Sequence, residues 1–149
     1  MTTAQAAAAD LEIDIAGKKY KLARFTGREW GEFDQYLAGR ILERTRLATA
    51  EMPNPDPFVA ASVALAARID SRMCTDPDVH AVITALWNSR EGTAEHARLM
   101  LRKSFPPPTR EMLLDLLEDP AWSTPYHAAV AAYLNPPKNE STPLNTASP

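Results

Sequence analysis

The stretch Phe25-Thr26-Gly27-Arg28-Glu29-Trp30 joins a segment of alternating apolar residues to a long amphipathic one, and it predicts the start of a helix. Thr26 can accept a hydrogen bond from the backbone N–H of Glu29, while the Glu29 carboxylate accepts one from the N–H of Thr26, which is the capping-box arrangement. Phe25 and Trp30 stand at the positions of a hydrophobic staple, whose contact fixes the angle at which the chain enters the helix. The stretch therefore predicts a β-hairpin held against a helical body.

On the N-terminal side of this stretch, the pattern predicts a two-stranded hairpin. Apolar residues alternate with acidic ones from Leu11 to Ile15 and with lysines from Lys19 to Leu22, around a turn at Gly17. A period of two is typical of half-buried strands. Because a lone hairpin is only marginally stable in water, it needs a surface to lie on, and the helix after Thr26 is the nearest one.

On the C-terminal side, spacings of three and four between apolar residues predict a series of helices. Prolines separate them at 52–57 and 106–108, where a helix cannot continue. Gly92 and Thr93 are expected to end one helix and cap the next, and Pro125 is expected to open the last one. The expected helical ranges are 27–50, 58–73, 77–91, 94–104, 110–118 and 123–134.

These elements predict a mainly α fold, a single helical domain of five to six helices with an N-terminal two-stranded β-hairpin. The 149 residues suffice for one hydrophobic core and are too few for two comfortable domains. We expect residues 1–10 to form a disordered N-terminal arm, residues 11–135 to form the domain and residues 136–149 to form a disordered tail. Both ends lack the apolar side chains that repay the entropy of ordering.

The composition narrows the class of partner. A net charge of −3 argues against a general affinity for nucleic acid, whose binding depends on neutralising phosphates. No apolar run approaches the roughly 20 residues of a membrane helix, and the first ten residues lack the basic and apolar regions of a secretory signal. We expect a cytoplasmic protein with no membrane or nucleic acid partner.

No group of side chains has the spacing of a catalytic, metal or cofactor site. His80, His96 and His127 fall on three different predicted helices. None of them has another histidine or a carboxylate four residues later, which is the spacing of a zinc-binding pair on a helix. The single cysteine, Cys74, ends an apolar helix, where a packed side chain is favoured over a nucleophile. We expect no catalytic residue, no metal ligand and no cofactor.

Two features resemble the tail assembly chaperones of long-tailed, siphovirus-type bacteriophages. The first is the order of elements from Leu11 to Trp30, a short hairpin followed by a capped helix. The second is residues 97–113, Ala-Arg-Leu-Met-Leu-Arg-Lys-Ser-Phe-Pro-Pro-Pro-Thr-Arg-Glu-Met-Leu. They resemble the family's apolar helix ending in Leu-Arg-Lys, its proline-containing break, and a Thr-x-Glu that opens an acidic helix with leucine pairs. Here the break has three prolines, and the aromatic residue expected within the apolar helix is absent.

The resemblance implies a non-enzymatic protein that binds the tape measure protein and helps recruit tail tube subunits during tail morphogenesis. Such a factor acts transiently in the host cytoplasm and is absent from the mature virion. Many genes of this family also yield a longer product by programmed frameshifting, with which the stretch Pro136–Asn139 is compatible. Self-association is left open.

A chaperone for an apolar helical client needs a groove that accepts an apolar stripe. The residues expected to line such a groove are Leu99, Phe105, Leu113 and Leu117. Packing in the core is the other interpretation of the same four residues.

The sequence is also compatible with three other classes of function. A structural virion protein, such as a head–tail connector or tail-completion subunit, would also be small and helical. A helical regulatory or DNA-binding protein would need a basic recognition helix, and the acidic balance and the proline-rich connector at 52–57 count against it. An enzyme is least favoured, because no titratable groups converge in the sequence.

Overall fold

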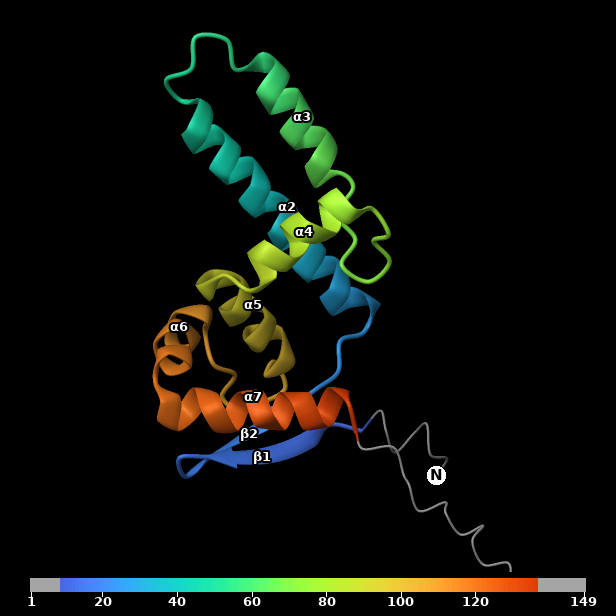
Figure 1. Cartoon of the computed structure of the whole chain (residues 1–149). Helices are drawn as coiled ribbons and strands as arrows, with labels where there is room; N and C mark the ends of the chain where they lie inside the picture. Colours follow the sequence, from blue (N-terminus) through green and yellow to red (C-terminus); the bar gives the residue numbers. More distant parts are fainter. Residues whose placement is uncertain (1–8, 137–149) are drawn as a thin grey trace, which may run out of the picture.

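The computed structural model describes residues 9–136, which hold six helices and one antiparallel β-hairpin. The expected fold class is therefore confirmed (Figure 1). The predicted disordered ends lie outside the described residues, except for Ala9, Asp10 and Pro136. The elements in chain order are β1 (Leu11–Ile15), β2 (Lys18–Leu22), α2 (Gly27–Thr49), α3 (Asp56–Ala66), α4 (Pro77–Trp87), α5 (Arg90–Met100), α6 (Arg110–Glu118) and α7 (Pro120–Leu134).

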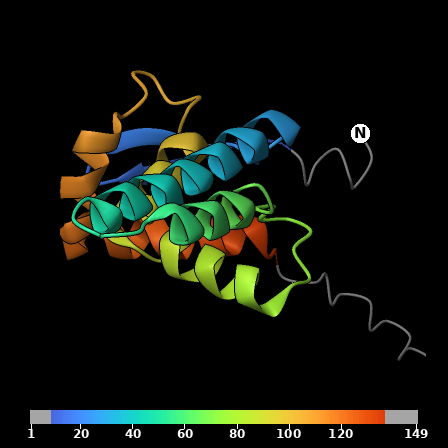
Figure 2. The same ribbon diagram turned by 90° about the horizontal axis from the view of Figure 1, so that it is seen from above.

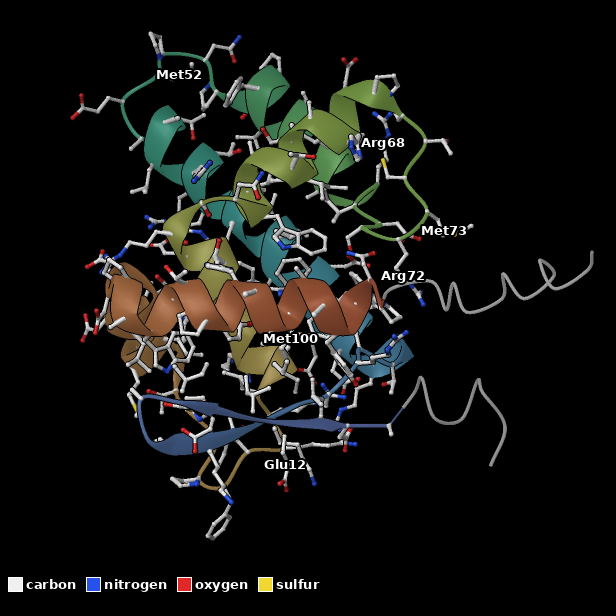
Figure 3. The ribbon with its side chains drawn as sticks, turned by 60° about the horizontal axis from the view of Figure 1, so that its bottom comes forward. Glu12, Met52, Arg68, Arg72, Met73 and Met100 are labelled. Carbon is white, nitrogen blue, oxygen red and sulfur yellow. The ribbon has the colours of Figure 1, made fainter. Side chains whose placement is uncertain are left out.

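The molecule consists of a body and a projecting arm. In the body, the hairpin lies along α7, and α5 and α6 complete the layer above it (Figure 1). The arm is formed by the C-terminal part of α2 and by α3, which lie side by side and antiparallel in both Figure 1 and Figure 2. Figure 3 places Met52 at the tip of this arm and Glu12 on the hairpin, at the opposite end of the molecule.

The first of two hydrophobic clusters, here called the body cluster, joins the hairpin to α5, α6 and α7. Strand β2 contributes Tyr20 and Leu22, because the period-two pattern turns both side chains to the same face. The indole N–H of Trp122 donates to the Tyr20 hydroxyl at 3.2 Å, and the Trp122 ring stacks on Tyr126 at 4.8 Å between centroids. The sequence predicts that the hairpin lies on the helix after Thr26. In the structure it lies mainly on α7 instead.

The second cluster, here called the arm cluster, lies among α2, α4 and α5. Phe33, Leu37 and Ile41 form the buried stripe of α2 at spacings of four residues, as the sequence predicts. Val79, Ile83 and Leu86 of α4 and Leu99 of α5 complete the cluster. Ala66 is the one α3 residue buried in it, so α3 adds little to the core.

The start of α2 forms as predicted. The Glu29 carboxylate accepts a hydrogen bond from the Thr26 N–H at 2.8 Å, and the Thr26 hydroxyl caps the first turn, which completes the capping box. Phe25 and Trp30 are in edge-to-face contact, with 4.9 Å between ring centroids. The predicted cap and staple are therefore confirmed, and they set the direction of α2 as it leaves the body.

Gly92 does not end a helix, which corrects the expected boundary. Helix α5 begins at Arg90, and the Ser89 hydroxyl caps it by accepting a hydrogen bond from the Gly92 N–H at 3.1 Å. A Cβ at position 92 would lie 1.9 Å from the carbonyl oxygen of Leu86. Glycine is required there because α4 and α5 meet at a sharp corner, and not because the chain leaves the helical conformation.

Other boundaries also differ from those expected. Helix α5 ends at Met100 and not near Ser104. Helix α7 begins at Pro120, where Asp119 caps it by accepting from the Ala121 N–H at 3.0 Å, and Pro125 lies inside the helix. Burial of Trp122 in the body cluster favours this earlier start over the local preference of proline. Helix α3 ends at Ala66 and not near residue 73, because the Asp34 carboxylate holds Ser71 in the following turn.

The two described residues before the hairpin contact the body. The Tyr133 hydroxyl donates to the carbonyl of Ala9 at 3.0 Å, and Lys103 pairs with Asp10 at 3.1 Å. The contacts between the start of the hairpin and the body therefore include the two residues before Leu11. Across the described residues, no helix combines the length and apolar character needed to span a membrane.

The corner at Gly92 generates a stability prediction. Gly92→Ala should lower the free energy of unfolding by at least about 2 kcal/mol, because the new methyl group meets backbone atoms that cannot move away without shifting α4. Urea unfolding followed by circular dichroism measures the change. Gly39→Ala is the matched control. It lies within α2 with nothing within 4 Å of the added Cβ, and it should raise stability by up to about 1 kcal/mol. Equal effects of the two variants would contradict this account of the corner.

Candidate docking surface

The four groove residues expected from the sequence do not share one surface. Leu99 is buried in the arm cluster and Leu113 in the body cluster, while Leu117 is partly buried against the latter. Phe105 points into solvent with 96% of its surface exposed. Leu99 and Leu113 therefore pack in the core, which is the other interpretation that the sequence allows for them.

Large apolar side chains are exposed along the arm instead. Helix α3 carries no charge after Asp56, and Ala66 is the one buried residue among its eleven. A helix that is apolar all round is ordinarily buried, whereas α3 packs on the rest of the chain through one side. Large apolar side chains exposed together on one arm are a candidate interaction surface. The exposed large apolar residues of the arm are Leu42, Leu47, Met52, Phe58, Val59 and Val63.

An apolar groove of about 330 Å³ opens where α2, α3 and α4 meet. Its α2 wall runs from Ile41 to Ala48, which is about 10 Å, or two helical turns. Phe58 and Leu65 line it from α3, and Val82, Ala85 and Leu86 line it from α4. We call this site the arm groove.

Local sequence explains why the arm groove stays open and apolar. The connector at 52–57 contains three prolines, which end α2 and allow α3 to fold back along it. Ala48 and Ala85 are too small to fill the space between α2 and α4. The Thr45 hydroxyl donates to the Ile41 carbonyl at 2.9 Å, so its donor is already used within the helix.

Arg44 is the one charged residue that lines the arm groove. Its neighbour one turn earlier, Arg40, pairs with Glu43 at 2.7 Å and with Glu91 at 2.5 Å. Arg44 is exposed and forms no ion pair with any residue in the range 9–136. The groove therefore offers apolar walls and one guanidinium whose charge is not neutralised by any described residue.

Two larger hollows, of about 430 and 560 Å³, have several charged residues in their lining, and some of these charges pair with one another. The hollow of about 560 Å³ is lined by Glu95, Arg98 and Arg102 among others. Arg98 pairs with Glu95 at 2.6 Å, which raises the pKa of the guanidinium, and Arg102 pairs with Glu29 at 3.1 Å. Within the described part of the chain, no three histidine, cysteine or acidic side chains gather into a cluster that could hold a metal ion.

His96, on α5, lies among aromatic rings of α2, of α4 and of the segment before α2. Its ring centroid is 4.8 Å from that of Phe25, 5.0 Å from Trp87 and 5.6 Å from Phe33. Burial among these rings lowers its pKa from the ordinary 6.5 to about 4. His96 is therefore an uncharged packing residue at neutral pH, which a sequence pattern of isolated histidines does not distinguish from a surface histidine.

The sequence contained a signal for the arm groove that periodicity alone did not reveal. Residues 57–67, Pro-Phe-Val-Ala-Ala-Ser-Val-Ala-Leu-Ala-Ala, include no charged residue and one hydroxyl. A helix without a polar face is either buried on all sides or covered by a partner. Helix α3 lies on the projecting arm, where the described chain covers one side of it, so coverage by a partner is the favoured alternative.

Comparison of the chain with models of protein families, with curated proteins and with solved structures finds no match. The function must therefore be argued from the sequence patterns and from the geometry of the arm.

The burial of His96 generates a prediction of pH dependence. Below pH 6.5 the unfolded chain protonates this ring, whereas the folded chain does so only near pH 4. The free energy of unfolding should therefore fall by about 3 kcal/mol between these pH values. Urea unfolding across the range measures it. His96→Phe should remove most of this decline, whereas the exposed His80→Gln should retain it. A decline of the same size in both variants would contradict the assignment to His96.

Proposed function

We propose that this protein is a tail assembly chaperone of a long-tailed bacteriophage, which binds the tape measure protein and helps recruit tail tube subunits during tail assembly. The observation that carries the proposal is the resemblance of residues 97–113 to the corresponding stretch of that family, in the order apolar helix, proline break and acidic helix. This stretch is the end of α5, the break and the start of α6.

The exposed apolar arm supports the proposal. A tape measure protein is long and aggregation-prone, and a chaperone for it needs apolar surface to cover the apolar stripes of its helices. The arm offers this surface at one end of the molecule, away from the hairpin (Figure 1). The body has its own buried cluster, so the arm can bind a client without exposing the core.

The proposal also assigns a place and a lifetime to the protein. The chaperone acts in the host cytoplasm, binds its client before the tail tube forms around it, and leaves as the subunits assemble. The stretch Pro136–Asn139, of which Pro136 is described, follows α7. A product extended by frameshifting there would carry its additional segment at the body end of the molecule.

The second candidate function is that of a structural virion protein, and the same arm favours it. Apolar surface of this kind would suit a connector or tail-completion subunit whose arm stays covered in the finished particle. The two functions differ in where the protein is found, since a chaperone is absent from mature virions and a structural subunit is present in fixed number.

Co-expression with the tape measure protein encoded beside this chain tests the proposal. The client should move from the insoluble to the soluble fraction and should co-purify with the tagged chain, because the arm covers its apolar stripes. An unrelated helical protein of similar size serves as the control and should leave the client insoluble. A client that stays insoluble and alone, together with this chain in purified mature particles, would replace the chaperone with the structural function.

A further inference from the structure

We propose that the arm groove holds one amphipathic helix of the client, with its apolar stripe between α3 and α4 and a carboxylate beside that stripe paired with Arg44. The identity of the client rests on the proposed function. The chemistry of the bound segment rests on the groove itself, through its apolar walls and its single guanidinium.

The walls of the groove favour a helix over an extended peptide. All three walls are α-helices, whose backbone N–H and C=O groups already bond to one another. An extended segment laid between them would leave its own backbone groups without partners against apolar side chains, which is unfavourable. A helix satisfies its backbone internally. The two-turn length of the groove matches apolar residues at positions i, i+3 or i+4, and i+7 of such a helix.

Arg44 specifies an acidic residue beside the apolar stripe. A helix lying over the groove removes water from this guanidinium, which no carboxylate in the range 9–136 neutralises. An uncharged segment would leave the cation partly desolvated without a partner, and a basic one would add repulsion. An aspartate or glutamate at the edge of the stripe provides the missing partner.

A second copy of this chain fits the groove less well. The exposed apolar helix that a second copy would insert is α3, which carries no charge from Pro57 to Ala67. Its one carboxylate, Asp56, stands at the first residue of the helix, before the apolar stripe that starts at Phe58. Self-insertion would therefore fill the groove and leave Arg44 without an anionic partner beside it.

Two designed peptides test the chemistry of the groove directly. Both are amphipathic helices of about 20 residues with leucines at the i, i+4 and i+7 positions, and they differ in a glutamate or a lysine beside the leucine stripe. The labelled peptides are titrated with the full chain and followed by fluorescence anisotropy. The glutamate peptide should bind about threefold or more tightly than the lysine peptide, and Arg44→Glu should reverse this order.

A blocking variant and its matched control locate the site. Ala85 is exposed and lines the groove, so Ala85→Lys should fill it and weaken both peptides about tenfold or more. Thr84 is exposed on the same helix and does not line the groove, so Thr84→Lys should leave binding unchanged. Far-UV circular dichroism and urea unfolding establish that both variants fold. The proposal would be overturned if a folded Ala85→Lys variant bound the peptides as tightly as the original chain does. It would also be overturned if the Arg44→Glu variant still bound the glutamate peptide more tightly than the lysine peptide.

Co-expression of the variants with the tape measure protein separates failure of this inference from failure of the proposed function. If Ala85→Lys keeps the client soluble as well as the original chain does, the groove is not the client site and the chaperone proposal stands. If the original chain binds the glutamate peptide through the groove but not the tape measure protein, the groove stands and the proposed client is wrong.

Analytical ultracentrifugation of the chain alone completes the test. A dimer that Ala85→Lys dissociates would make a second copy the occupant and overturn the proposal.

Discussion

The guanidinium of Arg102 is the point at which the hairpin, α2 and α5 are held together. It pairs with the Glu29 carboxylate at 3.1 Å and donates to the carbonyls of Leu99 at 2.7 Å and Arg24 at 2.8 Å. Burial acts to raise the pKa of Glu29, but the hydrogen bonds from Thr26 and the charge of Arg102 outweigh it, so the pKa is lowered. One charged group thereby fixes the capped end of α2 against the body, and the direction of the arm follows from it.

Local chemistry explains which parts of this fold could be predicted. The capping box, the staple and the period-two hairpin depend on residues close together in sequence, and each forms as expected. The boundary at Gly92 depends on how tightly α4 and α5 meet at the Leu86 carbonyl, and the boundary at Pro125 depends on the body cluster around Trp122. Glycine and proline are ordinarily read as breaks, so local preference alone places both boundaries wrongly.

The same distinction applies to the candidate site. Leucines on an amphipathic helix have one pattern whether they face a core or a partner, so the sequence could not separate Leu99 and Leu113 from a docking surface. What does separate them is which helices lie opposite, and that depends on the whole fold. The uncharged run at 57–67 was visible, but its exposure follows from α3 packing on one side alone, which only the three-dimensional arrangement reveals.

The one-sided packing of α3 affects the dynamics of the chain. This helix packs mainly on α2 and buries Ala66 alone, and helices of its length are marginal in water by themselves. Its amides should exchange with solvent before those of α2 and α5, which lie in the core. A bound segment would add the missing contacts on the open side. Binding of a segment to the arm would then slow hydrogen exchange in α3. Because this helix becomes more ordered, the loss of its conformational entropy would reduce the net free energy of binding.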